Sequence, residues 1–163
     1  MSDATVLSTE FHERDRAALV ELLRAYEKGL GISLCFQDFE AEIASLPGAY
    51  APPGGALILA RSAGGNLVGT VALRAFDATR GICEMKRLYV APAGRGQGLG
   101  RRLAERAIDE ARRLGYRAIR LDTLPVMREA QALYAALGFR DIANYNANPI
   151  EGTRFLEKTL ELP

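Results

Sequence analysis

The feature that most constrains this chain is a glycine-rich stretch, VAPAGRGQGLGRRLAERA, at residues 90–107. Glycines occupy every second position from Gly94 to Gly100, and a regular helical sequence follows directly. Glycine is disfavoured at such a place unless something must approach the backbone closely. A helix N-terminus carries free N–H groups and a partial positive charge, which suit an anion such as phosphate. We therefore predict a strand, an anion-binding turn and a helix.

Two familiar phosphate-binding loops do not fit this stretch. A Walker loop needs a lysine after its last glycine, and no lysine follows any of these glycines. A dinucleotide fingerprint needs G-x-G-x-x-G, but the sixth position is Leu99 when the count starts at Gly94, and Arg101 when it starts at Gly96. The pattern that remains is R-x-x-G-x-G over residues 95–100.

Length and composition predict one folded domain. The chain has 163 residues, of which 48% are hydrophobic, so it is long enough to bury a core. Its net charge of +1 argues against a general nucleic-acid binder, which is strongly basic. No apolar run is long enough to span a membrane, and residues 1–11 do not resemble a signal peptide, so we expect a cytoplasmic protein.

Cysteine and histidine usage predicts neither a metal site nor a nucleophile system. Cys35 and Cys83 are far apart, fit no ligand spacing, and are expected to be reduced and buried. The single histidine, His12, lies in a polar stretch at the start of a predicted helix, where we expect no catalytic role.

Hydrophobic periodicity and turn residues predict an α/β arrangement around one sheet. The expected strands cover residues 4–8, 56–62, 67–76, 81–92, 117–123, 138–141 and 153–160. The expected helices cover residues 11–28, 36–48, 99–114 and 126–137. Gly29, Gly115 and Gly138 are expected to end three of these helices.

The glycine pattern, placed between a strand and a helix, resembles the acetyl-CoA loop of the GNAT superfamily of N-acetyltransferases. EMKRLYVAP before the loop, RLDT after its helix and ALYAALGF further on extend the resemblance over at least residues 83–139. The resemblance implies an α/β (α+β) GNAT fold, with about six to seven strands in a mixed central sheet and helices on both faces. It implies a single domain over residues 1–163 that uses acetyl-CoA as co-substrate and no metal.

The resemblance also implies where the coenzyme binds. Backbone amides of the loop hold its diphosphate, and the strand before the loop splays from its neighbour near a bulge, so that the pantetheine arm bonds to main chain. Gly98 and Gly100 would let the phosphates approach, and we expect Arg95, Arg101 or Arg102 to reach them. The implied residues are Leu88, Tyr89, Val90, Arg95, Gly96, Gln97, Gly98, Leu99, Gly100 and Arg101.

The strand before the loop carries charges where a central strand should be apolar. In an ideal strand, Glu84 and Lys86 share a side with Leu88 and Val90. One interpretation is an ion pair of Glu84 with Lys86 or Arg87 on a wet face. The other is that this strand lines a substrate cleft, and the resemblance then implies Glu84 as the general base.

Tyr134 also has two interpretations. It belongs to an apolar helical stripe with Ala130, Leu133 and Leu137, which is typical of ordinary core. The resemblance implies instead that Tyr134 is catalytic and protonates the sulfur of coenzyme A.

These residues predict an N-acetyltransferase that acts by direct attack in a ternary complex on a primary amine of a small or amino-acid-like acceptor. Residues 11–46 and the loop at 144–152 would wall the acceptor pocket, although that loop is also consistent with a plain surface segment. Its polar members are Asn144, Tyr145, Asn146 and Asn148. A non-catalytic acyl-CoA sensing module and a protein-modifying acetyltransferase are the alternatives. We expect no nucleic-acid or membrane partner and leave a homodimer open.

Overall fold

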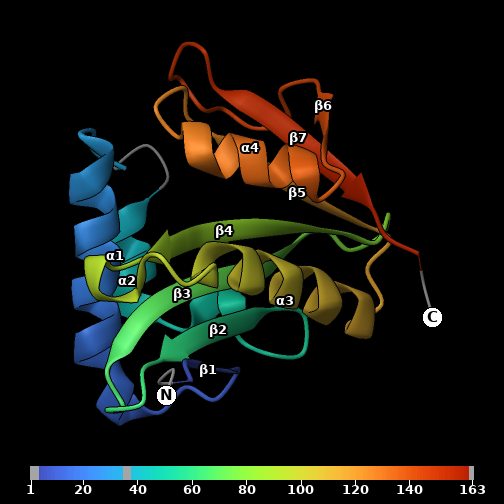
Figure 1. Ribbon diagram of the computed structural model, residues 1–163. Helices are drawn as coiled ribbons and strands as arrows, with labels where there is room; N and C mark the ends of the chain where they lie inside the picture. The colour runs from blue at the N-terminus through green and yellow to red at the C-terminus, as the bar shows by residue number, and fades with distance from the viewer. Residues whose placement is uncertain (1–3, 35–37, 162–163) are drawn as a thin grey trace.

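Seven strands form one mixed sheet in the order β1-β2-β3-β4-β5-β7-β6 (Figure 1). The structure is a computed structural model that describes residues 4–34 and 38–161. The strands are β1 Val6–Ser8, β2 Ala56–Arg61, β3 Leu67–Asp77, β4 Ile82–Val90, β5 Ala118–Thr123, β6 Arg140–Ile142 and β7 Arg154–Thr159. All pairs are antiparallel except β4–β5, which is parallel. The predicted α/β class and strand number are confirmed.

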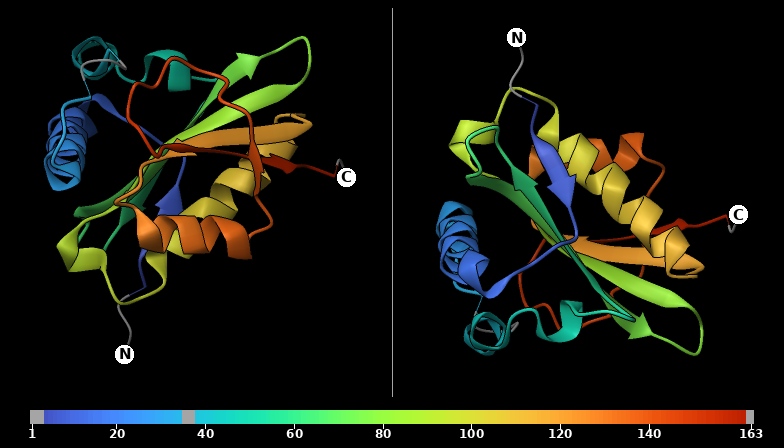
Figure 2. Two further views of the ribbon diagram at one scale, coloured as in Figure 1. Left: turned by 90° about the horizontal axis from the view of Figure 1, so that it is seen from above. Right: turned by 90° about the horizontal axis from the view of Figure 1, so that it is seen from below.

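Helices cover both faces of the sheet (Figure 2). Helices α1 Arg16–Leu30 and α2 Phe39–Ser45 lie on one face, and α3 Leu99–Arg113 and α4 Arg128–Ala136 on the other. Alternate residues of the central strands supply the two cores, because successive side chains of a strand point to opposite faces. Leu57, Leu59 and Ala72 pack with the α1/α2 side, whereas Ile58, Val71 and Leu73 pack with the α3/α4 side.

Some element ends differ from the sequence-based expectation. Helix α1 continues through Gly29 and ends at Leu30, because Gly31 is the residue that adopts the left-handed conformation, with φ of 71°. Cys83 is buried with a free thiol, whereas Cys35 lies outside the described residues. Within the described ranges, no helix is long and apolar enough to cross a membrane.

A bulge in β4 is the local irregularity that matters most for the site. Ala72 of β3 lies opposite Lys86, and Thr70 lies opposite Tyr89. A step of two residues along β3 therefore corresponds to a step of three residues along β4. Arg87 adopts the irregular backbone conformation of the bulge. Its φ of 62° is left-handed, which is uncommon outside glycine. The bulge reverses the side-chain alternation, so the expectation that Lys86 shares a side with Leu88 and Val90 is wrong.

Strands β4 and β5 separate soon after they begin. Their parallel pairing covers only Ile82–Ala118, Cys83–Ile119 and Glu84–Arg120, although β4 continues to Val90 and β5 to Thr123 (Figure 1). The backbone of β4 beyond Glu84 is therefore not paired to β5. The splay and the bulge that the GNAT resemblance implies are both present.

Candidate active site

A groove of about 930 Å³ opens beside the splayed end of β4. It lies between this strand, the glycine loop, the start of α3, helix α4 and the C-terminal part of α1. Of the residues implied for coenzyme binding, Leu88, Tyr89, Val90, Arg95, Gly96, Gly98, Leu99 and Gly100 line the groove. Gln97 and Arg101 lie outside its lining. Tyr26 and Met127, for which the sequence offered no signal, also line it.

The glycines of the loop divide into two kinds. A Cβ at Gly94 would lie 3.1 Å from Val68 and 3.2 Å from Leu99, so this glycine allows close packing. A Cβ at Gly98 would meet nothing within 4 Å, and one at Gly100 would meet only Val90 at 3.9 Å. Gly98 precedes the first residue of α3 with φ of 66°. The first amides of α3, which have no acceptor within the helix, therefore face open space.

The arginines of this region are already partly engaged. Arg95 lines the groove and donates through Nε to the carbonyl oxygen of Val90 at 3.1 Å. Arg101 donates to Glu105 at 2.8 Å, as i,i+4 neighbours on an exposed helix face. Arg102 donates through Nη2 to the carbonyl oxygen of Thr5 at 2.8 Å and links α3 to the N-terminal segment. Which of the three arginines reaches phosphate stays a prediction.

A second, inner cavity of about 30 Å³ continues from the groove into the gap between β4 and β5. Tyr26, Leu30, Leu88 and Met127 line both spaces. The inner cavity has room for about one water molecule. Its polar lining consists of Tyr26, Lys86, Arg87, Asp122 and Tyr134. A chain lying in the groove would therefore direct its end towards these groups.

Tyr134 of α4 packs in the core and also lines the inner cavity. Its side chain is only 4% exposed, and its ring packs edge-on against Phe139 with centroids 5.6 Å apart. Tyr134 belongs to the lining of the inner cavity, and no residue in the described part of the chain is hydrogen-bonded to its hydroxyl. Burial raises the pKa of Tyr134 above its usual value, so the hydroxyl keeps its proton at neutral pH.

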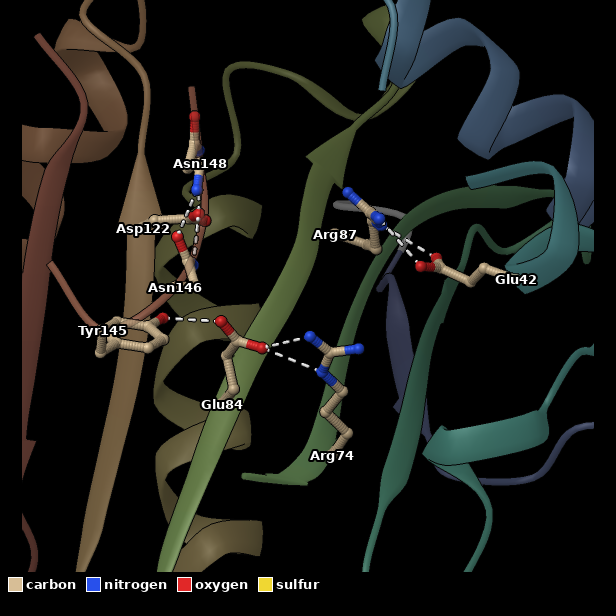
Figure 3. Close-up of polar contacts among 8 residues, drawn as sticks. All are labelled: Glu42, Arg74, Glu84, Arg87, Asp122, Tyr145, Asn146 and Asn148. Atoms are coloured by element: carbon tan, nitrogen blue, oxygen red, sulfur yellow. Dashed lines mark hydrogen bonds and ion pairs between the residues drawn. The ribbon is translucent and has the colours of Figure 1, made fainter. Parts of the chain in front are cut away.

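Glu84 is 1% exposed and fully engaged by neighbouring elements (Figure 3). Arg74 of β3 contacts its Oε1 at 2.9 Å through Nε and at 2.7 Å through Nη2. The hydroxyl of Tyr145 donates to its Oε2 at 2.6 Å. The expected ion pair with Lys86 or Arg87 is thus replaced by one with Arg74. Glu84 does not belong to the lining of the groove or of the inner cavity, and its role as general base stays a prediction.

The loop at 144–152 contacts Glu84 near the start of β4 and Asp122 near the end of β5. Tyr145 reaches Glu84, and the side-chain amides of Asn146 and Asn148 each donate to Oδ2 of Asp122 at 3.0 Å (Figure 3). Asn144 accepts a hydrogen bond from the backbone N–H of Asn146 and shapes the turn. The loop is therefore part of the site and not a plain surface segment.

Two cationic residues of β4 border the inner cavity. Burial lowers the pKa of Lys86, which is 8% exposed. Arg87, at the bulge, forms two hydrogen bonds with Glu42 of α2, at 2.9 and 2.8 Å (Figure 3). Its guanidinium also lies over the ring of Phe39, 5.0 Å from the centroid. Arg87, the residue at the bulge of β4, is therefore bound to α2 by both contacts.

The architecture agrees with known proteins. The profile described as the Acetyltransferase (GNAT) family matches residues 16–139. An uncharacterized N-acetyltransferase of Schizosaccharomyces pombe is 38% identical over 135 residues, which are 83% of this chain and 82% of the relative. A GNAT-family acetyltransferase structure from Staphylococcus aureus has a TM-score of 0.81 at 23% identity, covering 97% of this chain and all of that one.

A structure from Salmonella typhimurium, solved with its cofactor acetyl-CoA, has a TM-score of 0.69 at 22% identity and covers 97% of this chain and 95% of that one. At such identity the likeness to solved structures concerns the fold, whereas the profile match and the yeast relative concern the sequence. Together with the glycine loop, the bulge and the splayed strands, they assign the family. The chain belongs to the GNAT family of acetyl-CoA-dependent N-acetyltransferases.

Proposed function

We propose that the enzyme transfers the acetyl group of acetyl-CoA to the primary amine of a small, amino-acid-like molecule by direct attack. One observation carries the proposal. The groove beside the loop shares lining residues with an inner cavity of about 30 Å³, and Tyr134 lines that cavity. The diphosphate would lie at the amides of residues 95–101, and the pantetheine arm along the unpaired edge of β4, with the thioester at the inner cavity.

The chemistry needs an acid on the sulfur side and proton removal on the amine side. An alkyl amine with a pKa near 10 is neutral in roughly one molecule in a thousand at pH 7. The neutral nitrogen forms the new C–N bond, the C–S bond breaks, and the sulfur takes a proton. Tyr134, protonated and facing the cavity, is the proposed donor. Glu84 is the candidate base that the family resemblance implies.

The shape of the acceptor side supports a small acceptor. The loop at 144–152 lies against β4 and β5, where Tyr145 contacts Glu84 and Asn146 contacts Asp122. A protein-borne lysine would have to pass between this loop and helices α1 and α2. Release of coenzyme A should therefore occur with free amines, and acetylation of peptide lysines alone would contradict this acceptor class.

Acetyl-CoA is expected to stabilise the protein strongly. At 100 times its dissociation constant, a ligand that binds only the folded state adds about 2.7 kcal/mol to the free energy of unfolding. For a domain of this size the melting temperature should rise by roughly 5–10 °C. NAD and ATP serve as controls and should shift it far less, because the loop matches neither of their motifs. A melting curve unmoved by saturating acetyl-CoA would refute the proposed site.

Gly100→Val tests the loop more cleanly than Gly98→Val. Gly98 has a positive φ, so a branched residue there strains the backbone, whereas Gly100 lies in the first turn of α3 with room for a side chain. We expect Gly100→Val to preserve stability but to weaken acetyl-CoA binding about 10- to 100-fold, because the new side chain separates phosphate from the amides. Isothermal calorimetry measures the affinity.

The matched control for this substitution is Gly64→Val. Gly64 lies in the hairpin turn between β2 and β3, away from the groove, and a Cβ there would meet only Asn66 and Ser62, at 3.8 and 3.9 Å. It should bind acetyl-CoA like the wild type. Equal affinity in both variants would mean that Gly100 serves only the turn.

A further inference from the structure

A carboxylate other than Glu84 borders the inner cavity itself. Asp122 is the penultimate residue of β5 and lines the cavity together with Tyr134. Ile119 and Leu121 of the same strand pack into the core under α3 and α4, so Asp122 points towards the opposite face of the sheet. Tyr134 comes from α4, on the face of the sheet that α3 and α4 cover. The gap between β4 and β5 thus has a hydroxyl on one side and a carboxylate on the other.

The loop at 144–152 holds this carboxylate in a defined position. Asn146 and Asn148 both donate to Oδ2, each at 3.0 Å, and among the described residues they are the hydrogen-bond donors to Asp122. The second oxygen, Oδ1, is thereby left for another donor. Glu84 differs in this respect, since Arg74 contacts one of its oxygens and Tyr145 donates to the other. Of the two carboxylates, Asp122 is the one that lines the inner cavity and keeps an oxygen without a donor among the described residues.

We propose, on the basis of the function proposed above, that Asp122 is a catalytic residue that binds the ammonium group of the acceptor through Oδ1 and takes its proton. An ammonium is a strong partner for a carboxylate oxygen because the hydrogen bond is charge-assisted. Asn146 and Asn148 position the carboxylate, and Glu84 positions Tyr145 and Arg74. The acceptor is accordingly a primary amine that arrives protonated from the α1/α2 face.

The proton balance of this step is complete. The acceptor nitrogen gives up two protons over the turnover. The first goes to Asp122 and from there to water, which leaves the nitrogen lone pair free to form the C–N bond. The second goes to water as the C–S bond breaks, when the electron pair goes to sulfur and Tyr134 supplies the proton there. Tyr134 regains its proton from water, so each turnover releases one proton to solvent.

The experiment compares Asp122→Asn with Glu84→Gln, each made in the whole chain and assayed by coenzyme A release with a panel of amines. Asp122→Asn keeps an oxygen for the two amides but removes the charge. We expect it to lose ~100-fold or more in turnover at pH 7, as for loss of a positioned base, with unchanged acetyl-CoA affinity. Glu84→Gln should lose less. Asp109→Asn, on the exposed side of α3, is the matched control and should keep the wild-type rate.

The pH profile separates a base from a merely structural aspartate. Between pH 7 and pH 9 the neutral fraction of an alkyl amine rises about 100-fold. The absence of the base therefore slows the variant less at pH 9 than at pH 7. The ratio of wild-type to Asp122→Asn rates should fall at least ~10-fold over this range. The other titratable or charged groups of this region are Lys86 and Arg87 of β4, Tyr26 of α1 and Tyr134 of α4, which line the cavity, together with Glu84 and Tyr145. These groups are present in the wild type and in the Asp122→Asn variant, so the ratio of the two rates largely cancels the effect of their titration.

The outcomes are distinguishable. A wild-type enzyme that releases coenzyme A beside an Asp122→Asn variant of equal rate, or with a loss that is the same at every pH, overturns this proposal alone. A larger loss in Glu84→Gln also overturns it. A wild type that binds acetyl-CoA but acts on no amine overturns the proposed function and this assignment with it. If Asp122→Asn does not fold, Asp122→Ser, which retains an acceptor for the amides, takes its place.

Discussion

Tyr134→Phe is expected to reduce turnover by ~100-fold or more, provided that protonation of the sulfur limits the rate, while the fold and acetyl-CoA affinity survive. The ring of Tyr134 packs against Phe139 and is retained in the variant. The hydroxyl makes no hydrogen bond within the described chain, so its removal leaves no buried partner unsatisfied, and the residue lines the inner cavity. Burial raises the pKa of Tyr134, so at neutral pH its hydroxyl holds a proton that it can donate to the departing thiolate.

The core interpretation predicts the opposite order of effects. If Tyr134 only packs, phenylalanine is tolerated, and only Tyr134→Ala is harmful, through a cavity that costs about 3–5 kcal/mol. Turnover and the free energy of unfolding should therefore be measured for both substitutions. Single-turnover rates are needed as well, because slow product release can hide a loss in the chemical step. A phenylalanine variant with wild-type single-turnover rates would remove Tyr134 from the mechanism.

Tyr116→Phe is the matched control. Tyr116 is also a largely buried tyrosine, but its hydroxyl donates to the carbonyl oxygen of Gly54. Removing that hydroxyl should cost about 0.5–1.5 kcal/mol in stability, because a partly buried carbonyl loses its donor, and should leave turnover unchanged. The two tyrosines are thus expected to show opposite signatures, one in rate and one in stability.

The groove residues around the glycine loop were predictable from sequence because their signals are local. The alternate glycines, a strand before them and a helix after them lie within about twenty residues, and a helix N-terminus has the same physical properties in any fold. Even there, the sequence did not separate Gly94, which permits packing, from Gly98 and Gly100, which leave the amides open. That distinction depends on Val68, which is distant along the chain.

The acceptor side was predicted less well because its contacts are distant in sequence. The bulge at Arg87 reverses the alternation of β4, and no pattern in the sequence marks it. Arg74 became the partner of Glu84 because the antiparallel register places these residues opposite each other. Asp122 carries no sequence signal beyond its place near a strand end. It gains importance only through the splay of β4 from β5 and the closure of the 144–152 loop.

The ion pair of Arg87 with Glu42 is expected to stabilise the bulge in β4. The side chain of Arg87 is 3% exposed and that of Glu42 14%, so the guanidinium depends on protein groups rather than on water. Removing one partner of a buried pair typically costs about 3–5 kcal/mol, because the other charge stays buried. Glu42→Ala is expected to lower the free energy of unfolding by this amount. Since the chain has no tryptophan, circular dichroism in urea is the suitable probe.

Glu40→Ala provides the control from the same helix. Glu40 pairs with Arg24, but the two side chains are 72% and 46% exposed, and exposed pairs contribute about 0–1 kcal/mol. Because Arg87 forms the bulge, Glu42→Ala should also weaken acetyl-CoA binding, whereas Glu40→Ala should not. In Arg87→Met combined with Glu42→Ala, part of the lost stability should return, since no charge remains buried there. Equal, small losses in Glu40→Ala and Glu42→Ala would mean that the pair does not hold the bulge, and that the backbone of β4 opens the gap by itself.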